Sequence, residues 1–201
     1  MNCSSPAPKL NDLLLIGASA GGPAALASII AKLPSGFRAA VVIAQHVDSV
    51  FIPTFVKWLS GQTTLHVRVA HENDGPKPGS ILIADTRQQV VFRDRDHLGY
   101  RPYPPGTTYQ PCIDAFFESA AAFRYDHLVG MVLTGMGKDG ARGLKALRNA
   151  GALTIAQDAA SSVVYGMPKA AVEGGAAKEV LSLQAIAPRL TAIFSREGRN
   201  K

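Results

Sequence analysis

Short apolar runs alternate with helix-like segments along most of this chain, and that alternation is the feature that most limits its fold. Six runs are expected to be strands: residues 13–16, 39–44, 65–69, 80–83, 128–133 and 152–156. Several of them are continuously apolar, which is typical of parallel strands that helices bury on both faces. The sequence therefore predicts an α/β fold with a doubly wound, mostly parallel sheet.

Helix-like segments fill the gaps between these runs. Six are predicted, over residues 23–33, 52–59, 113–123, 141–150, 168–173 and 183–195. Pro23 suits the first turn of its helix, where the missing N–H is harmless, and Gly151 suits the position after a helix end. Between residues 85 and 111 the alternation breaks. We expect a small antiparallel hairpin excursion there, which forms one wall of an active site.

The length and composition of the chain predict one folded domain. Its 201 residues are enough for a single α/β domain, and 47% of them are apolar while 18% are charged. That balance is typical of a globular protein with a packed core. We therefore expect a flexible N-terminal leader at residues 1–11, one domain at residues 12–195, and a C-terminal tail at residues 196–201.

The sequence also argues against several classes of protein. It contains no signal peptide and no apolar run of about 18 residues, so we predict a cytoplasmic chain without membrane insertion. The net charge of +6 is spread along the chain, which argues against nucleic-acid binding. The histidines and the two cysteines lack the spacing of metal ligands, and Cys112 is expected to be a small buried side chain. No metal and no cofactor are predicted.

A glycine-rich turn follows the first predicted strand. It reads G-A-S-A-G-G over residues 17–22, so that Ser19 stands in a G-x-S-x-G pattern between a strand and a helix. Such a turn exposes a hydroxyl beside backbone N–H groups and the positive end of a helix dipole. Ser19 is therefore a candidate nucleophile. The alternative is a plain glycine-rich loop with a capping serine.

A serine nucleophile needs a base, and His46 is the histidine best placed to supply one. It follows the second predicted strand, and catalytic groups in open α/β sheets gather outside the carboxyl ends of the strands. The carboxylate that orients such a base is predicted at Asp139, in the turn T-G-M-G-K-D-G over residues 134–140. The backbone N–H groups of Met136 and Ala20 are predicted to form an oxyanion hole.

The same turn allows a second interpretation. Gly135, Gly137 and Gly140 form the G-x-G-x-x-G pattern of dinucleotide-binding loops, and Asp158 follows at a plausible ribose-binding position. Asp139, however, would put a carboxylate where a pyrophosphate must lie, and such loops belong to the first strand of their fold. Nucleotide binding is therefore kept as the weaker alternative.

With these turns in view, the sequence resembles the catalytic domain of the bacterial chemotaxis protein-glutamate methylesterases (CheB-type). The matching segments are residues 16–22, 44–46, 133–140, 151–158 and 165–169. The resemblance implies a doubly wound sheet, hydrolysis of receptor glutamate γ-methyl esters to glutamate and methanol, and deamidation of receptor glutamines. It also implies a catalytic triad at Ser19, His46 and Asp139, with the Met136 N–H in the oxyanion hole.

The chain departs from the family pattern at three places. Ala20 follows the nucleophile where the family often has threonine, a change that is tolerable because only the backbone N–H is used. Residues 84–89 read A-D-T-R-Q-Q in place of A-P-G-x-x-H, and residues 108–112 read T-Y-Q-P-C where the family usually has H-R-P-S. Both segments are expected to line the approach of the substrate, so they bear on specificity more than on chemistry.

Members of this family usually carry an N-terminal receiver domain, whereas only the short leader precedes the first strand here. We expect either a stand-alone enzyme, controlled by a separate regulatory protein, or a catalytic fragment of a longer one. The expected partners are the methylated cytoplasmic helices of chemotaxis receptors. The altered segments leave one further hypothesis open, a catalytically silent interaction module that keeps the fold.

Overall fold

A parallel sheet forms the centre of the molecule. The computed structural model describes residues 12–103 and 105–195, and within them seven parallel strands pair in the order β3-β4-β2-β1-β7-β8-β9. The leader predicted at residues 1–11 and the tail predicted at residues 196–201 lie outside the described residues. The strands are β1 (Asp12–Ala18), β2 (Ala40–Gln45), β3 (His66–Val69), β4 (Ser80–Ile83), β7 (His127–Val132), β8 (Leu153–Gln157) and β9 (Glu179–Leu181).

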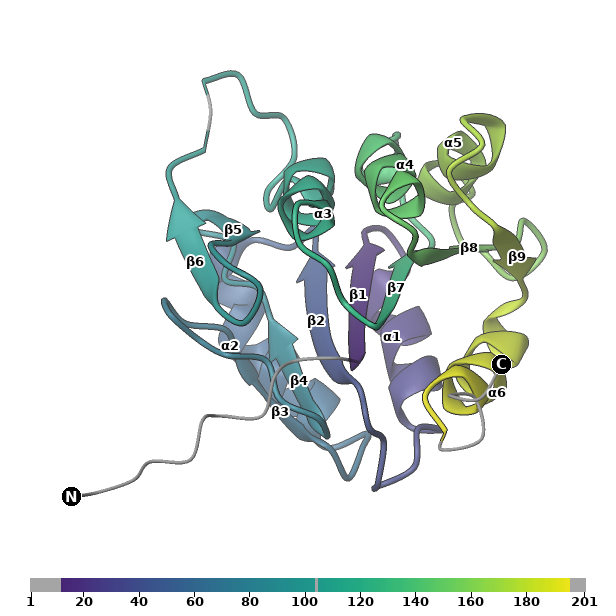
Figure 1. Cartoon of the computed structure of the whole chain (residues 1–201), viewed down its shortest axis with the longest axis horizontal. Coiled ribbons are helices and arrows are strands. Elements are labelled where there is room, and N and C mark those ends of the chain that lie inside the picture. Colours follow the sequence, from purple (N-terminus) through teal and green to yellow (C-terminus); the bar gives the residue numbers. More distant parts are fainter. Residues whose placement is uncertain (1–11, 104, 196–201) are drawn as a thin grey trace.

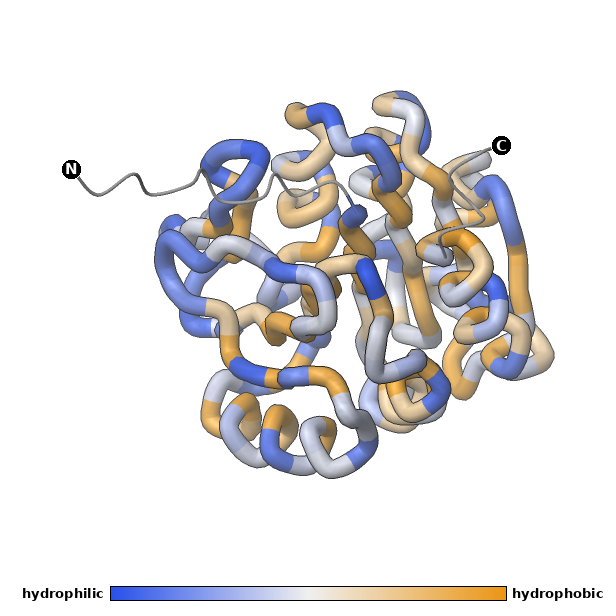
Figure 2. Tube along the Cα trace, turned by 60° about the horizontal axis from the view of Figure 1, so that its bottom comes forward, coloured by the Kyte–Doolittle hydropathy of each residue, from blue (hydrophilic) through white to orange (hydrophobic). Residues whose placement is uncertain are grey.

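Helices cover both faces of this sheet, so each face has its own apolar core. One core contains side chains of α1 (Gly22–Ile30), α2 (Ile52–Ser60) and α6 (Leu183–Ile193). The other contains side chains of α3 (Ile113–Ala121), α4 (Ala141–Asn149) and α5 (Met167–Glu173), which lie side by side in Figure 1. Figure 2 shows hydrophobic strands inside and hydrophilic loops outside. Because both faces are covered, β1 and β2 are buried along their whole length.

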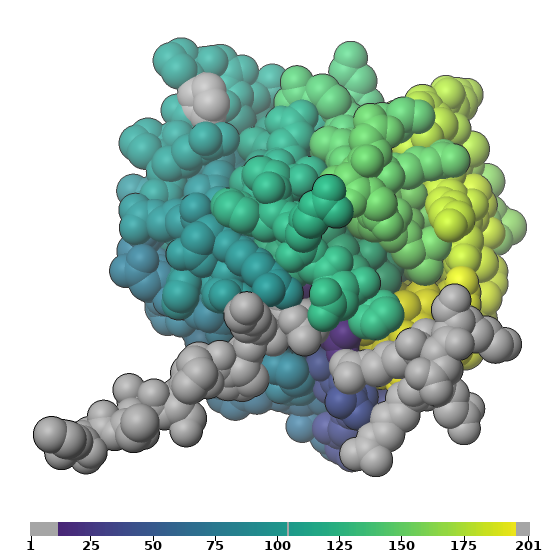
Figure 3. Space-filling model, viewed as in Figure 1, coloured from purple at the N-terminus to yellow at the C-terminus, as the bar shows by residue number. Residues whose placement is uncertain are grey.

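An antiparallel hairpin, β5 (Gln89–Phe92) and β6 (Leu98–Arg101), leaves the sheet after β4. It packs against α3, where the rings of Phe92 and Phe116 stack with their centroids 6.0 Å apart. In the space-filling view of Figure 3 the hairpin and the helices α3 to α5 hide nearly all of the strands. The hairpin therefore extends one face of the molecule beyond the sheet.

The predicted fold class is confirmed, as are the hairpin excursion and the six predicted strands and helices. Two short elements were not predicted, β9 and the 3-10 helix η1 (Ser49–Phe51). Strand β9 has only three residues, and its central Val180 is 46% exposed, so it lacks the buried apolar run by which the other strands were identified. None of the helices in residues 12–103 and 105–195 has the length and apolar character to cross a membrane.

The order of the strands determines where loops meet. Strand β1 lies between β2 and β7, with Ala18 opposite Gln45 and Gly17 opposite Val132. Because all three strands run in the same direction, the segments that follow them begin at one edge of the sheet. We call this the catalytic edge; it carries the turns that begin at residues 19, 46 and 133.

Candidate active site

Ser19 lies at the catalytic edge, directly after β1 and just before α1. Its backbone N–H donates a hydrogen bond to the carbonyl of Thr134 at 3.1 Å, and its side chain is half-buried. Gly21, two residues later, has a φ of 77°, a left-handed conformation that favours glycine. The tight turn between strand and helix therefore depends on glycine, as the G-x-S-x-G pattern predicts.

The turn after β7 packs directly against the Ser19 turn. The Thr134 hydroxyl donates to the carbonyl of Ala20 at 2.9 Å and accepts a hydrogen bond from the Val164 N–H at 2.9 Å. A Cβ on Gly135 would lie only 2.7 Å from Cβ of Ser19. The absence of a side chain at residue 135 is thus what allows the two turns to approach.

A hydrogen bond joins the imidazole of His46 to the carboxylate of Asp139. His46 Nε2 lies 2.9 Å from Asp139 Oδ2, although the two residues are 93 positions apart. An ionised carboxylate only accepts hydrogen bonds, so we assign the ring proton to Nε2 and the lone pair to Nδ1. His46 therefore has the tautomer that a general base needs, with Nδ1 as its basic atom.

Asp139 is held by the first turn of α3 as well as by His46. The backbone N–H groups of Ile113 and Asp114 donate to its two oxygens at 2.8 and 2.9 Å, and Gly140 N–H donates at 3.0 Å. Burial alone would raise the pKa of Asp139, but the hydrogen bonds from His46, Ile113 and Asp114 outweigh it and hold the pKa below its usual value. The carboxylate is thus ionised although it is only 4% exposed.

Ser19 and His46 are neighbours through their backbones. The His46 N–H donates to the Ala18 carbonyl at 3.0 Å, and Gln45 Nε2 donates to the carbonyls of Ser19 and His46 at 3.0 and 2.9 Å. Within the described ranges, no hydrogen bond joins the Ser19 hydroxyl to the imidazole. Such contacts are often long in free enzymes and tighten in complexes. The structure thus brings all three predicted residues to one edge and joins two of them through their side chains.

Tyr109 covers one face of the imidazole. The rings of His46 and Tyr109 are stacked, with centroids 5.2 Å apart and planes 5° from parallel. The Tyr109 hydroxyl occupies the space beside Gly137, where an added Cβ would lie 2.5 Å from it. Tyr109 therefore contacts both the base and the turn that carries Met136. It lies in the segment 108–112 that departs from the family pattern, but no sequence pattern indicates the stack.

The two backbone donors predicted for an oxyanion hole, Ala20 and Met136, both lie at the catalytic edge. Neither N–H group donates to an acceptor within residues 12–103 and 105–195. The Met136 side chain is 72% exposed, so the turn presents its backbone and an apolar side chain outward. Unpaired N–H groups beside a serine can stabilise negative charge that develops on a substrate oxygen.

Cys112 lies beside the triad without the properties of a nucleophile. Its thiol is 3.6 Å from Asp139 Oδ1, and burial, followed by the nearby Asp139 and Asp114 charges, raises its pKa to about 11. A thiol with so high a pKa is protonated at neutral pH and unreactive. Cys112 was predicted to be a small buried side chain, whereas the structure shows it half-buried.

The residues that the nucleotide hypothesis requires are engaged elsewhere. Asp158 accepts hydrogen bonds from Ser161 N–H at 2.9 Å and from Ser161 Oγ at 2.6 Å, so it closes its own loop. Asp139 fills the turn that would have to hold a pyrophosphate. In the part of the chain that the structure describes, no three His, Cys, Asp or Glu side chains gather as metal ligands would.

Comparisons with known proteins point to one family. The family model described as CheB methylesterase matches residues 14–190. A protein-glutamate methylesterase/protein-glutamine glutaminase of Mesorhizobium japonicum is 49% identical over 96% of this chain and 56% of its own length. One from Cupriavidus pinatubonensis is 52% identical over 89% of the chain and 52% of its own length. The chain thus spans about half the length of these curated relatives.

A solved structure agrees with the sequence relatives. The crystal structure of the Thermotoga maritima CheB methylesterase catalytic domain matches with a TM-score of 0.86 at 30% sequence identity. The match covers 91% of this chain and 98% of that one. The chain is therefore similar to a catalytic domain over nearly its whole described length.

Proposed function

This chain belongs to the CheB methylesterase family, and we propose that it hydrolyses γ-methyl esters of glutamate side chains on chemotaxis receptors, releasing methanol. The observation that carries the proposal is the hydrogen bond between His46 and the buried Asp139, at the same edge as Ser19. A hydroxyl, an imidazole and a carboxylate in that order are the groups that acyl transfer by a serine enzyme requires.

The reaction begins at Ser19. His46 Nδ1 takes the hydroxyl proton while Ser19 Oγ attacks the γ-carbonyl carbon of the ester. Asp139 stabilises the imidazolium that results, because its carboxylate already faces Nε2 at 2.9 Å. The tetrahedral intermediate then expels the methoxy group, which leaves as methanol with the proton from His46. The product of this half-reaction is a glutamyl ester on Ser19.

Water completes the cycle. His46 deprotonates a water molecule that attacks the acyl carbon, and the proton returns to Ser19 Oγ as the glutamate carboxylate leaves. In both half-reactions the carbonyl oxygen becomes negative, and the N–H groups of Ala20 and Met136 are the donors that would stabilise it. A glutamine side chain would react by the same steps with ammonia as the leaving group, so deamidation of receptor glutamines is part of the proposal.

The substrate side chain is presented by a protein, so the partner we propose is the methylated helical region of a chemotaxis receptor in the cytoplasm. Support comes from the openness of the catalytic edge, where Tyr109 is 37% and Met136 is 72% exposed. A separate regulatory protein is proposed as the source of control.

The test compares methanol release from methylated receptor membranes by the wild type and by Ser19→Ala. The variant should lose at least about a thousandfold in rate, because it lacks the attacking atom. Ser35→Ala, an exposed serine outside the catalytic edge, is the matched control and should retain full activity. Methanol release by a folded Ser19→Ala protein at the wild-type rate would refute the esterase, and absence of release by the wild type would support the silent interaction module.

A further inference from the structure

A groove begins beside His46 and runs away from it, past the carboxyl ends of β4 and β3. It consists of three adjoining hollows of about 360, 550 and 400 Å³, and Arg87 lines all three. The hollow nearest the imidazole starts at Val47, the residue after His46, and is lined by Val47, Asp48, Ser49, Thr86, Arg87 and Gln110. A substrate chain that extends beyond the ester can therefore continue into this groove.

Both segments that depart from the family pattern meet in the hollow nearest His46. Thr86 and Arg87 come from segment 84–89, and Gln110 comes from segment 108–112. These positions are far apart in the chain, so only the fold brings them together. The chain-specific residues thus lie in one place, beside the segment that directly follows His46.

Thr86 carries a polar group without a partner. Its hydroxyl is buried and has no hydrogen-bond partner among the residues that the structure describes, and the whole residue is only 4% exposed. A buried hydroxyl without a hydrogen bond is unfavourable, so such groups are rare unless water or a ligand satisfies them. Thr86 lines the hollow, but its oxygen itself is covered by neighbouring atoms, so a rotation about χ1 is needed to turn the hydroxyl toward a group that enters the hollow.

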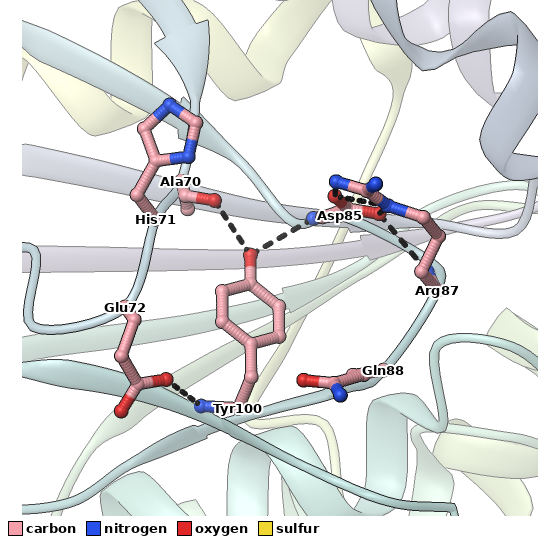
Figure 4. A pocket seen from close by; sticks show the side chains of 7 residues that line it. All are labelled: Ala70, His71, Glu72, Asp85, Arg87, Gln88 and Tyr100. Atoms are coloured by element: carbon pink, nitrogen blue, oxygen red, sulfur yellow. Dashed lines mark hydrogen bonds and ion pairs between the residues drawn. The ribbon is translucent and has the colours of Figure 1, made fainter.

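Arg87 projects into the groove with part of its hydrogen-bonding capacity unused. Its Nε donates to Asp85 Oδ2 at 2.9 Å, and this pair lowers the pKa of Asp85. Its Nη1 donates to no acceptor in the described ranges, and the side chain is 75% exposed. Figure 4 shows the Arg87 and Asp85 pair at one side of the outer hollow, His71 and Glu72 at the other, and the Tyr100 ring between them.

The charges around the groove favour a neutral ligand. Asp85 already neutralises Arg87, and Asp48 makes no ion pair with any described residue. A carboxylate in the hollow would therefore face Asp48 and Asp85 without a free cation to balance it. A carboxamide, by contrast, can accept hydrogen bonds from Arg87 Nη1 and the Thr86 hydroxyl, and can donate to Asp48 or the Gln110 side chain.

We propose that this groove is a specificity site that binds a carboxamide side chain, glutamine or asparagine, close to the methylated glutamate on the receptor segment. The proposal rests on the proposed function, because it takes the receptor as the substrate. Thr86, Arg87 and Gln110 hold the carboxamide and thereby orient the neighbouring ester toward Ser19. The altered segments then select among receptor sites and leave the acyl-transfer steps as they are.

The experiment uses peptides with one γ-methyl glutamate and with Gln, Glu or Ala at each of the flanking positions. For the wild type, the Gln peptide should exceed the Ala peptide by about three- to tenfold in kcat/KM at one or more positions, the range for one or two neutral hydrogen bonds. The Glu peptide should be no better than the Ala peptide. Thr86→Val and Gln110→Ala should each reduce the Gln preference to within about twofold.

Gln62→Ala is the matched control, since Gln62 is an exposed glutamine in a hollow away from the catalytic edge, and it should retain the wild-type preference. Hydrolysis of p-nitrophenyl acetate, which has no flanking chain, serves as the reference rate for each variant. Equal rates for Gln and Ala peptides with the wild type, or a Gln preference that survives in Thr86→Val and Gln110→Ala, would overturn the groove proposal. Activity of Ser19→Ala on the reference ester would instead overturn the catalytic mechanism, so the two failures are distinct.

Discussion

The two sides of the catalytic edge differ in how their polar groups are satisfied. On one side, Asp139 accepts hydrogen bonds from His46 and from three backbone N–H groups, and it is almost completely buried. On the other side, the Thr86 hydroxyl has no partner among the described residues, and Arg87 is largely exposed. In the proposed mechanism, the groups around Asp139 and His46 are fixed before the substrate arrives, whereas the groove leaves polar groups unpaired until a substrate chain enters it.

The largest effect is expected at Asp139, on the side of the catalytic edge where the polar groups are hydrogen-bonded. Asp139→Asn keeps the shape but removes the charge, and it puts an NH₂ donor among the N–H groups of Ile113 and Asp114 or against His46 Nε2. His46 would then lose its tautomer, and we expect kcat to fall by about 10³- to 10⁴-fold. Methanol release from methylated receptor measures the loss. A loss below about tenfold in a folded variant would show that this carboxylate does not orient the base.

A smaller loss of activity is expected at Gly135, where the turn after β7 packs against the Ser19 turn. In Gly135→Ala the new Cβ would lie 2.7 Å from Ser19 Cβ and 2.3 Å from Met167 Sδ. Displacing Ser19 by about 1 Å should reduce kcat about a hundredfold, and the overpacking should lower the free energy of unfolding by about 1–3 kcal/mol. Urea unfolding and methanol release measure the two effects. Gly36→Ala is the control, since nothing lies within 4 Å of an added Cβ there.

Removal of the Tyr109 ring that stacks on His46 should have a moderate effect. Tyr109→Leu removes the ring that lies parallel to the imidazole. An aromatic pair contributes about 0.5–1.5 kcal/mol, so kcat/KM should fall by about two- to tenfold. Tyr109→Phe keeps the ring and should stay close to the wild type. Equal losses in both variants would assign the effect to the hydroxyl beside Gly137 and would contradict a role for stacking.

The smallest expected effect concerns Cys112, which contacts Asp139 without taking part in the chemistry. Burial raises its pKa to about 11, so the folded protein holds the thiol proton at a pH where an unfolded chain has begun to lose it. Alkylation of native Cys112 by iodoacetamide at pH 8 should be slow and should rise about tenfold per pH unit toward that pKa. Peptide mapping by mass spectrometry measures the rate. Labelling of the native protein as fast as in urea would contradict the protected thiol.

The strands and the positions that follow them could be predicted because their signals are local. The buried runs that form β1, β2 and β7 are apolar in sequence, and Ser19, His46 and the turn that holds Asp139 follow these runs. Parallel strands in a doubly wound sheet bring those positions to one edge. The fold class and the common location of the three residues therefore follow from patterns within a few residues of each.

The groups that hold the site could not be predicted in the same way. Ile113 and Asp114 bind Asp139 through backbone N–H groups at the start of α3, and such donors leave no trace in residue identity. A useful signal was present in the Pro111-Cys112 boundary before a predicted helix, because helix N-termini attract carboxylates. The Tyr109 stack and the Thr86 hydroxyl depend on contacts between distant segments, for which the sequence contains no periodic signal.

The position of the proposed triad at the three central strands β2, β1 and β7 has a consequence for how such an enzyme can diversify. The groove includes the segment after β2 that carries His46, but much of its lining comes from the loops after β3 and β4, from the hairpin and from the segment before α3, which are peripheral to those strands. Mutations there can accumulate without moving the reacting atoms. Under the proposed function, an enzyme of this design can change the receptor segment that it accepts while its catalytic residues stay in place.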